Sequence, residues 1–532
     1  MNRNEVNHNE MKAHSSPLLH VLTLLALLVA AAMARLRVTM LDFNSLLTSY
    51  LQDDAFYYYK VASNIFSLHR ITYDGEQLSN GFHPLWLALI SFFYTPANDG
   101  VDFVYRVQWI MFFCALLTVV ALYFTLTRLR AGWFCSVIVT AVFCVHSTFV
   151  DMQMNGLETS LNTLMLLLLF NAFLTIFLNP QVPINRYIYF GVVAAAAFLV
   201  RTDNGIALLL LFLALAWISR RMAMQCWSRL LVGGLVALFL VLPWLIWNQV
   251  NFGSLVQGSG KVETIYWGEP NFNLQHILYN FLIMPSKIYQ NMQIFSSIFI
   301  STSISRVLLG ILFIGCWISA MFFLLLQRRS ALSACATAVF CIAVFSVFCY
   351  HAAFRSFVRM WYFMPVGLVA LLSIAGVVIW CRNCCKTQWA ENAANVLLAL
   401  WLGSVVWLYS PEKLPGATNN LSSHLVVANW VNANTQPDAI IGSMNSGVLG
   451  YLVHRKVINL DGVMDSRSMR AHWDRRRAEY IHERGIGYLV DNDGALALFC
   501  NETRLHTCQR VFSFGDSANP GRVVQLVKNS QE

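Results

Sequence analysis

The chain has 532 residues, of which 57% are hydrophobic and only 12% are charged. Soluble domains carry roughly 25% charged residues, so a soluble protein of this composition would lack the polar side chains needed to cover its surface. The same figures exclude a disordered chain, a collagen-like repeat and a nucleic-acid-binding domain, and a net charge of +9 is expected where Lys and Arg gather on cytoplasmic loops. The composition therefore predicts a polytopic membrane protein.

Apolar runs long enough, or nearly long enough, to cross the roughly 30 Å hydrocarbon core of a bilayer recur along the chain. They predict membrane helices at 18–34, 104–126, 132–149, 157–178, 186–200, 204–219, 228–247, 305–327, 331–350, 360–381 and 393–410. The run 84–96 has only 13 residues, and we interpret it as a helix lying at the membrane interface. The basic connections then all face the cytoplasm, as the positive-inside rule requires; they hold Arg128/Arg130, Arg220/Arg221/Arg229, Arg328/Arg329 and Arg382/Lys386.

The domain organisation follows from this topology. Residues 1–17 are a polar cytoplasmic tail, and residues 18–410 are the transmembrane domain, whose first outer loop covers 35–103. Residues 411–532 alternate short apolar stretches with polar helical ones, which is typical of a small α/β domain. The predicted fold is an α-helical polytopic membrane protein with about 11 transmembrane helices, an interfacial helix in the first outer loop and a small C-terminal extracytoplasmic α/β domain.

The first outer loop holds the residues best suited to chemistry. Asp53 and Asp54 are adjacent and precede an aromatic run. Such an acid could take a proton from an acceptor hydroxyl as a general base, or the pair could hold a divalent cation through its oxygens. The alternative without a chemical function is that the pair caps an interfacial helix. Charged residues are nearly absent from the middles of the spans, so we expect chemistry at the outer face rather than a midplane transport site.

The motifs in this loop, taken together, resemble those of the GT-C glycosyltransferases. Asp53-Asp54 with Tyr57, and later His83-Pro84-Leu85, occupy the places of that family's acid pair and His-Pro-Leu segment. The likeness is to the bacterial branch that uses polyprenyl-phosphate sugars and is related to protein mannosyltransferases and aminoarabinose transferases. Further similar segments follow in the same order along the chain, at 155–159, 201–204, 252–254, 359–363, 447–451 and 457–462.

The resemblance implies one sugar transfer from a polyprenyl-phosphate donor with inversion at the anomeric carbon. Asp53 would be the general base on the acceptor hydroxyl, and Asp54 would support it. Cations would stabilise the departing lipid phosphate, and the candidates on the outer side are Arg201, Lys261, Arg355 and Arg359. Residues expected to position the substrates are Tyr57, His83, Glu158 and Asp203.

Several of these residues have simpler interpretations. An Arg at the end of a span, such as Arg201 or Arg355, could extend to lipid headgroups, and Lys261 could be an ordinary solvated lysine. Glu158 could pair with Arg201 without touching substrate, and His83 could serve only to hold the loop.

The tail is expected to act on the acceptor side or in stability. Asp461, Asp465 and Asp491 end apparent strands, where ligand sites often form, but an Asp there is also common in turns; we give the tail no catalytic residue. Cys500 and Cys508 could form a disulfide if the tail is exported.

These observations predict a hexosyl- or pentosyltransferase that acts on a glycan, lipid or protein acceptor at the outer face of a bacterial inner membrane. The N-terminus would be cytoplasmic and the C-terminal domain periplasmic. No metal is assigned, although a divalent cation stays open, because two adjacent Asp residues supply too few oxygen ligands to require one. The competing hypothesis is a membrane transporter or lipid flippase without covalent chemistry.

Overall fold

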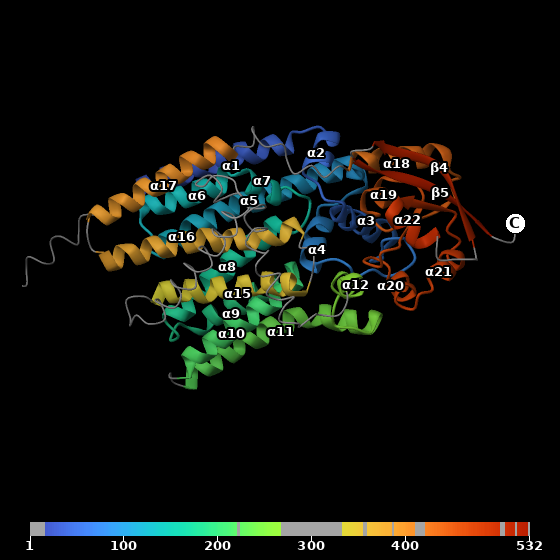
Figure 1. The fold of residues 1–532 in the computed structure, drawn as a ribbon. Coiled ribbons are helices and arrows are strands. Elements are labelled where there is room, and N and C mark those ends of the chain that lie inside the picture. The colour runs from blue at the N-terminus through green and yellow to red at the C-terminus, as the bar shows by residue number, and fades with distance from the viewer. Residues whose placement is uncertain are drawn as a thin grey trace, which may run out of the picture.

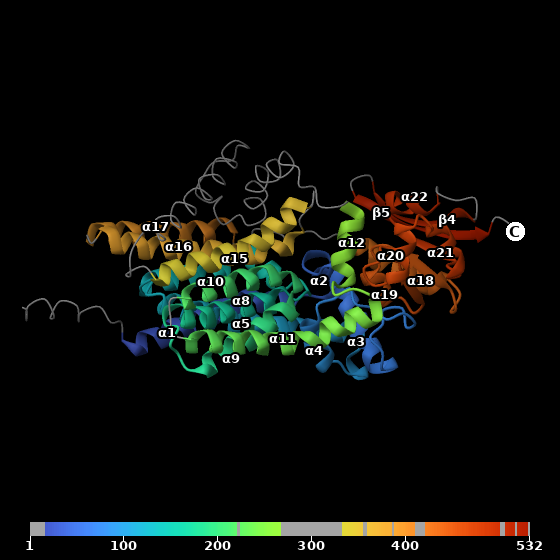
Figure 2. The ribbon, with the colours of Figure 1, turned by 90° about the horizontal axis from the view of Figure 1, so that it is seen from below.

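The computed structural model describes residues 16–220, 224–267, 332–354, 359–385, 388–409, 421–500, 506–516 and 519–529. It has two parts, a bundle of long helices and a C-terminal α/β domain at one end of that bundle (Figure 1). Turning the molecule by 90° keeps the domain at the same end, beyond the first outer loop (Figure 2). The candidate site lies where these two parts meet.

Helices occupy ten of the eleven predicted spans, and the run 305–327 lies outside the described residues. They are α1 (Pro17–Thr39), α5 (Val101–Arg128), α6 (Trp133–Val145) with α7 (Ser147–Gln153), α8 (Thr159–Leu178), α9 (Ile184–Val200), α10 (Gly205–Ser219), α11 (Met224–Phe252), α15 (Leu332–Phe354), α16 (Met364–Cys385) and α17 (Gln388–Tyr409). Six helices in the described part are long and apolar enough to cross a membrane, or seven if α6 and α7, bent by 61°, form one span. The chain is therefore a multi-pass membrane protein.

Burial differs between helices of similar hydrophobicity. The central helix α8 packs against α5, α9 and α15 and buries most of its side chains. The outer helices α1 and α11 instead expose large apolar residues such as Phe239, which is 75% exposed. Apolar residues that face outward on long helices are the side chains a bilayer would cover.

The first outer loop folds into short helices at the end of the bundle. It contains α2 (Phe43–Ser49), α3 (Asp53–Leu68) and α4 (Pro84–Phe92). The run that we interpreted as interfacial becomes α4, which has 9 residues and is too short to span a bilayer. Its Trp86 is fully buried against the core that α3 also joins, so this helix is anchored to protein.

The C-terminal part has the predicted α/β character. Its sheet runs in the order β2-β1-β3-β5-β4. The strands β1 (Ile440–Ser443), β2 (Lys456–Asn459) and β3 (Tyr488–Asp491) pair in parallel, whereas β4 (His506–Asp516) and β5 (Asn519–Asn529) pair antiparallel. One face packs on α18 (Ser422–Asn434) and α19 (Gly447–Leu452), and the other on α21 (Arg477–Glu483) and α22 (Asp493–Cys500), with α20 (Ser466–Trp473) nearby. Cys508 is disulfide-bonded.

The C-terminal domain packs against the first outer loop. The hydroxyl of Tyr73 donates a hydrogen bond of 2.6 Å to the carbonyl oxygen of Ser446, and Ser79 Oγ donates one of 2.7 Å to that of Met464. Arg484 Nη2 lies 2.8 Å from Asp74 Oδ2. Val448 and Met464 belong to the same apolar core as the aromatic side chains of α3. This packing places the domain against the end of the helical bundle where that loop lies.

Candidate active site

A polar cavity of about 130 Å³ lies between the first outer loop, the helix ends and the C-terminal domain. Its side chains come from segments that are distant in sequence. The polar and aromatic residues around it include Asp54, Tyr57, Tyr58, His83, Glu158, Arg201, Asp203, Gln257, Ser259, His351, Arg359, Trp361, Tyr362, Asn445 and Asp461. Most of the charged side chains of the predicted site thus line one cavity.

Asp54 faces this cavity from the first turn of α3. Its Oδ2 lies 3.5 Å from Arg359 Nη1, and the guanidinium of Arg359 stands over the ring of Trp361 at 5.3 Å. Both charged side chains are partly open to solvent, at 35% and 45% exposure. A carboxylate and a guanidinium therefore face each other where a substrate can reach both.

A second carboxyl enters the cavity from the C-terminal domain. Asp461 follows β2, and its Oδ1 accepts a hydrogen bond of 2.8 Å from the backbone N–H of Val463. Burial, together with the charge of Asp54 and despite the Val463 hydrogen bond, raises the pKa of Asp461 to about 8. Asp461 is therefore largely protonated at pH 7 and can act as a hydrogen-bond donor in the cavity.

Asp53 has a different environment from Asp54, although the two residues are adjacent. Its Oδ2 accepts a hydrogen bond of 3.0 Å from the backbone N–H of Gly447, and its Oδ1 accepts one of 2.9 Å from Val448. His424 Nδ1 lies 3.2 Å from the same Oδ1. The carboxylate thus binds the N-terminus of α19, a favourable position for an anion, and it is not among the residues lining the cavity.

The electrostatics of Asp53 match these contacts. Burial by itself would raise its pKa, but the contact with His424, the charge of Arg522 and the Val448 hydrogen bond lower the pKa to about 2. Close packing reinforces the arrangement, since a Cβ at Gly447 would lie 1.9 Å from the carbonyl oxygen of Asp53. Asp53 therefore joins α3 to α19 as a permanently ionised group.

Arg201 is held by two acids. Its Nη1 lies 2.6 Å from Glu158 Oε1, and Nη2 and Nε donate to both oxygens of Asp203 at 2.6 and 3.1 Å. His351 Nε2 lies 2.9 Å from Asp203 Oδ2, and the ring of Tyr362 covers the guanidinium at 4.6 Å. Glu158 thus forms the ion pair with Arg201 that one of our alternatives describes, and it also lines the cavity. Two carboxylates offset the Arg201 charge, and this paired cluster forms one side of the cavity.

His83 completes that wall. Burial lowers the pKa of its ring, so the ring is neutral at pH 7. The backbone N–H of Thr202 points at Nδ1 from 3.4 Å, and the amide nitrogen of Gln257 lies 3.3 Å from the same atom. Nδ1 is therefore the acceptor, and Nε2, 3.7 Å from Glu158 Oε1, carries the hydrogen.

The predicted site residues divide into three groups. Seven line the cavity: Asp54, Tyr57, His83, Glu158, Arg201, Asp203 and Arg359. Asp53 binds α19, and Lys261 lines a neighbouring cavity. Arg355 lies outside the described residues.

Other lining residues were not among the sequence candidates. They include Tyr58, Gln257, His351, Tyr362, Asn445 and Asp461. His351 directly follows the predicted span 331–350, and Tyr362 lies near the start of the predicted span 360–381, so their position at span ends could have marked them as candidates. Asp461 carried the signal of an Asp after a strand, but nothing in the sequence brings that strand to α3.

The described residues contain no group of three or more His, Cys, Asp and Glu side chains arranged to hold a metal ion. The cavity itself offers Asp54 and Asp461 as oxygen donors beside the cation Arg359. A divalent ion here would need further ligands from substrate or water.

The chain is similar in fold to solved membrane enzymes. It matches the apo oligosaccharyltransferase of Archaeoglobus fulgidus with a TM-score of 0.51 and 15% identity, over 92% of this chain and 73% of the other. It matches ArnT from Cupriavidus metallidurans bound to undecaprenyl phosphate with a TM-score of 0.54 and 14% identity, over 96% and 98%. Both are GT-C glycosyltransferases, so the predicted GT-C resemblance is confirmed as the fold of this chain.

Sequence comparison gives less information. Residues 417–524, within the C-terminal domain, match a family model described as a domain of unknown function, DUF8728. No curated protein is significantly similar to the chain in sequence.

Proposed function

We propose that this protein is a membrane glycosyltransferase that moves a hexosyl or pentosyl group from a polyprenyl-phosphate donor to a cell-envelope acceptor. The observation that carries the proposal is the cavity where Asp54, Asp461 and Arg359 meet at the end of an apolar helical bundle. A donor whose lipid lies in the bilayer and whose sugar lies above it would bring its reactive bond to this level. The GT-C fold supports the same activity, and the undecaprenyl phosphate bound to ArnT supports a polyprenyl carrier.

We assign the general base to Asp54. The resemblance to GT-C enzymes favours Asp53, but both oxygens of Asp53 already accept backbone hydrogen bonds, and its pKa of about 2 makes it a weak base. Asp54 lies in the cavity and is partly open. Protonated Asp461 keeps the second carboxyl neutral and can donate a hydrogen bond to a substrate oxygen.

The reaction is a direct displacement at the anomeric carbon. An acceptor hydroxyl oxygen forms the new bond to this carbon, while the bond from the carbon to the phosphate oxygen breaks. The hydroxyl proton goes to Asp54, and polyprenyl phosphate leaves with the bonding electrons. Attack from the face opposite the phosphate inverts the configuration. Negative charge grows on the departing phosphate, and Arg359 is the cavity cation placed to stabilise it.

The proposed orientation follows from the same site. The N-terminus of α1 and the C-terminal domain lie at opposite ends of the bundle (Figure 2). With the N-terminus in the cytoplasm of a bacterium, the cavity and the C-terminal domain face the periplasm. Acceptors there are envelope glycans, lipids or exported proteins.

The test is a transfer assay with the full chain in proteoliposomes. A panel of polyprenyl-phosphate hexoses and pentoses is incubated with an envelope extract, with and without EDTA, and a protein-free liposome is the control. We expect loss of one donor and appearance of polyprenyl phosphate together with a glycosylated product of inverted configuration. Movement of intact lipid-linked sugar across the bilayer without release of polyprenyl phosphate would instead identify a flippase. The EDTA arm reports whether a divalent cation is required.

A further inference from the structure

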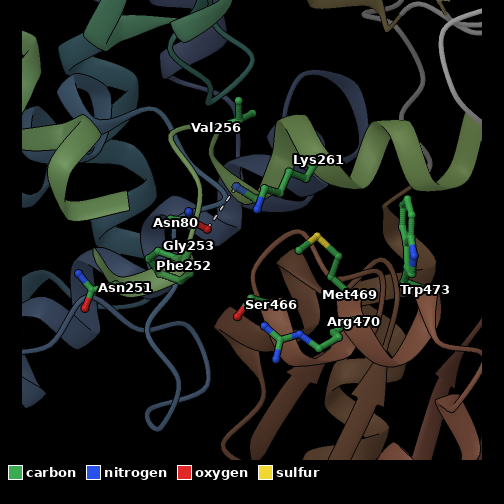
Figure 3. Close-up of a pocket in the computed structure, with 11 residues that line it drawn as sticks. Asn80, Asn251, Phe252, Gly253, Val256, Lys261, Ser466, Met469, Arg470 and Trp473 are labelled. Carbon is green, nitrogen blue, oxygen red and sulfur yellow. Dashed lines mark hydrogen bonds between the residues drawn. The ribbon is translucent and has the colours of Figure 1, made fainter. Parts of the chain in front are cut away.

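A second, larger cavity of about 470 Å³ lies beside the candidate active site. It opens between α12 (Gly258–Trp267), the end of α11 and α20 of the C-terminal domain (Figure 3). Lys261 extends from α12 on one side, and Met469, Arg470 and Trp473 extend from α20 on the other. The mechanism proposed above uses none of these side chains.

The two cavities share a thin wall made of backbone. Asn80 and Gly258 line the larger cavity, while their neighbours Gly81 and Gln257 line the smaller one. Asn80 Oδ1 accepts a hydrogen bond of 3.2 Å from the N–H of Gly258, the dashed line in Figure 3. A Cβ at Gly81 would lie 2.0 Å from the carbonyl oxygen of Val463. The two cavities are therefore neighbours, separated by the closely packed backbone of Asn80–Gly81 and Gln257–Gly258.

The charged side chains described around the larger cavity are cationic. Among its described lining residues Lys261 and Arg470 are cationic and none is acidic. Burial and the nearby charge of Arg470 lower the pKa of Lys261, so the two cations are close enough to repel each other. Two like charges facing one space favour an anion between them. The N-terminus of α20 is already capped by Asp465, so this preference comes from the two side chains.

The other side chains that line the larger cavity are suited to binding a saccharide. Trp473 is 63% exposed and offers a flat apolar ring with an N–H at its edge. Asn80, Asn251 and Ser466 add neutral polar groups. A hydroxyl-rich ring with one acidic substituent matches this combination of an exposed aromatic ring, polar groups and cations.

We propose that this cavity is the acceptor subsite and that it binds the phosphate or carboxylate group of an anionic saccharide acceptor between Lys261 and Arg470. The assignment rests on the proposed glycosyl transfer, because it names the acceptor class for that reaction. In this arrangement the reacting hydroxyl of the same acceptor enters the smaller, neighbouring cavity, which Asp54 lines.

The first test measures binding and needs no activity. The full chain in phosphatidylcholine nanodiscs is titrated with glucose 6-phosphate and with glucose, using saturation-transfer NMR. The variants are Lys261→Gln, Arg470→Gln and, as the matched control, Arg467→Gln, an exposed residue of the same helix that does not line the cavity. Losing one charged hydrogen-bond partner should weaken binding of the phosphorylated sugar about tenfold. The control should bind as the wild type does.

Several outcomes would overturn the assignment. Equal binding of glucose and glucose 6-phosphate, or an equal loss in the Arg467→Gln control, would remove the anion site. Displacement of the sugar phosphate when phosphatidylglycerol is added to the nanodiscs would assign the cavity to lipid headgroups instead.

The second test uses transfer, where it has been detected with a native acceptor. Arg470→Gln should raise the KM for the acceptor about tenfold and leave the KM for the donor and kcat unchanged. A change in donor KM alone would assign Lys261 and Arg470 to the donor. Absence of transfer by the wild type would contradict the proposed function, while the binding test would still decide the anion site.

Discussion

Asp53 and Asp54 are consecutive residues of the first turn of α3, yet their carboxylates lie in two different regions of the molecule. Successive residues of a helix point about 100° apart, so Asp53 faces the N-terminus of α19 while Asp54 faces the cavity. The first region is closed and fully hydrogen-bonded, and the second is polar and partly open. Two identical side chains are thus suited to opposite tasks, one holding two parts together and the other exchanging a proton.

The largest expected effect is the loss of transfer activity in the Asp54→Asn variant. Glu158 and Asp203 are paired with Arg201. Without the Asp54 carboxylate the acceptor hydroxyl therefore has no base, and general base catalysis contributes about 10²–10⁴-fold. We expect kcat to fall by about 10³-fold in the proteoliposome assay, with the melting temperature of the purified protein unchanged.

Asp53→Asn is the matched control variant for this experiment, because it makes the same change at the adjacent residue. If it lowers kcat by 10³-fold without loss of stability while Asp54→Asn stays active, the assignments of the two residues must be exchanged.

Arg359→Gln should have the next largest effect. It removes the cation facing Asp54 and with it the stabilisation of the departing phosphate, so we expect kcat/KM to fall by about 10²-fold. Arg359→Lys should recover part of the activity, because a point charge replaces the guanidinium. Full activity of Arg359→Gln would show that the phosphate is stabilised by another group.

A smaller effect is expected for docking of the C-terminal domain. The lowered pKa of Asp53 stabilises the folded state above its unfolded value near 4, and this contribution is lost as the pH falls toward 2. Asp53→Asn should therefore cost on the order of 2 kcal/mol at pH 7, and its difference from the wild type should shrink below pH 4. The melting temperature in detergent, measured as a function of pH, reports this loss of stability. The rate at which protease releases the C-terminal domain reports its docking.

Gly447→Ala probes the same contact without changing a charge. The added Cβ would meet the carbonyl oxygen of Asp53, whereas a Cβ at Gly487, in the same domain, meets nothing within 4 Å. We expect Gly447→Ala to promote release of the domain and Gly487→Ala to leave it docked. Equal behaviour of the two variants would contradict the docking role of this turn.

The smallest expected effect on transfer concerns its pH dependence. The pKa of Asp461 is raised to about 8, so the folded state holds a proton that the unfolded state loses near pH 4. Stability therefore falls as the pH rises from about 4 to about 8. Asp461→Asn should be more stable than the wild type at pH 8, and its transfer rate should lack the wild type's decline above that pH. A parallel pH profile for the two proteins would remove Asp461 from the site.

Much of the architecture could be predicted from the chain alone. The apolar runs are long enough to specify helices whatever surrounds them, and ten of the predicted spans contain helices in the described residues. The short run at 84–96 was correctly separated from the spans because its length cannot cross a bilayer. The alternation after residue 411 predicted an α/β domain because strand and helix periodicities are local properties.

The sequence itself therefore determined the composition, the positions of the spans and most of the candidate residues that line the cavity, through local periodicity, length and charge. The sequence did not determine the different environments of Asp53 and Asp54. It also did not determine that Asp461 lines the cavity, or that the cavity beside Lys261 shares a wall with it. These features depend on contacts between α3 and a domain almost 400 positions later in the chain. A carboxylate's burial, partners and pKa are set by such neighbours, so only the folded structure decides them.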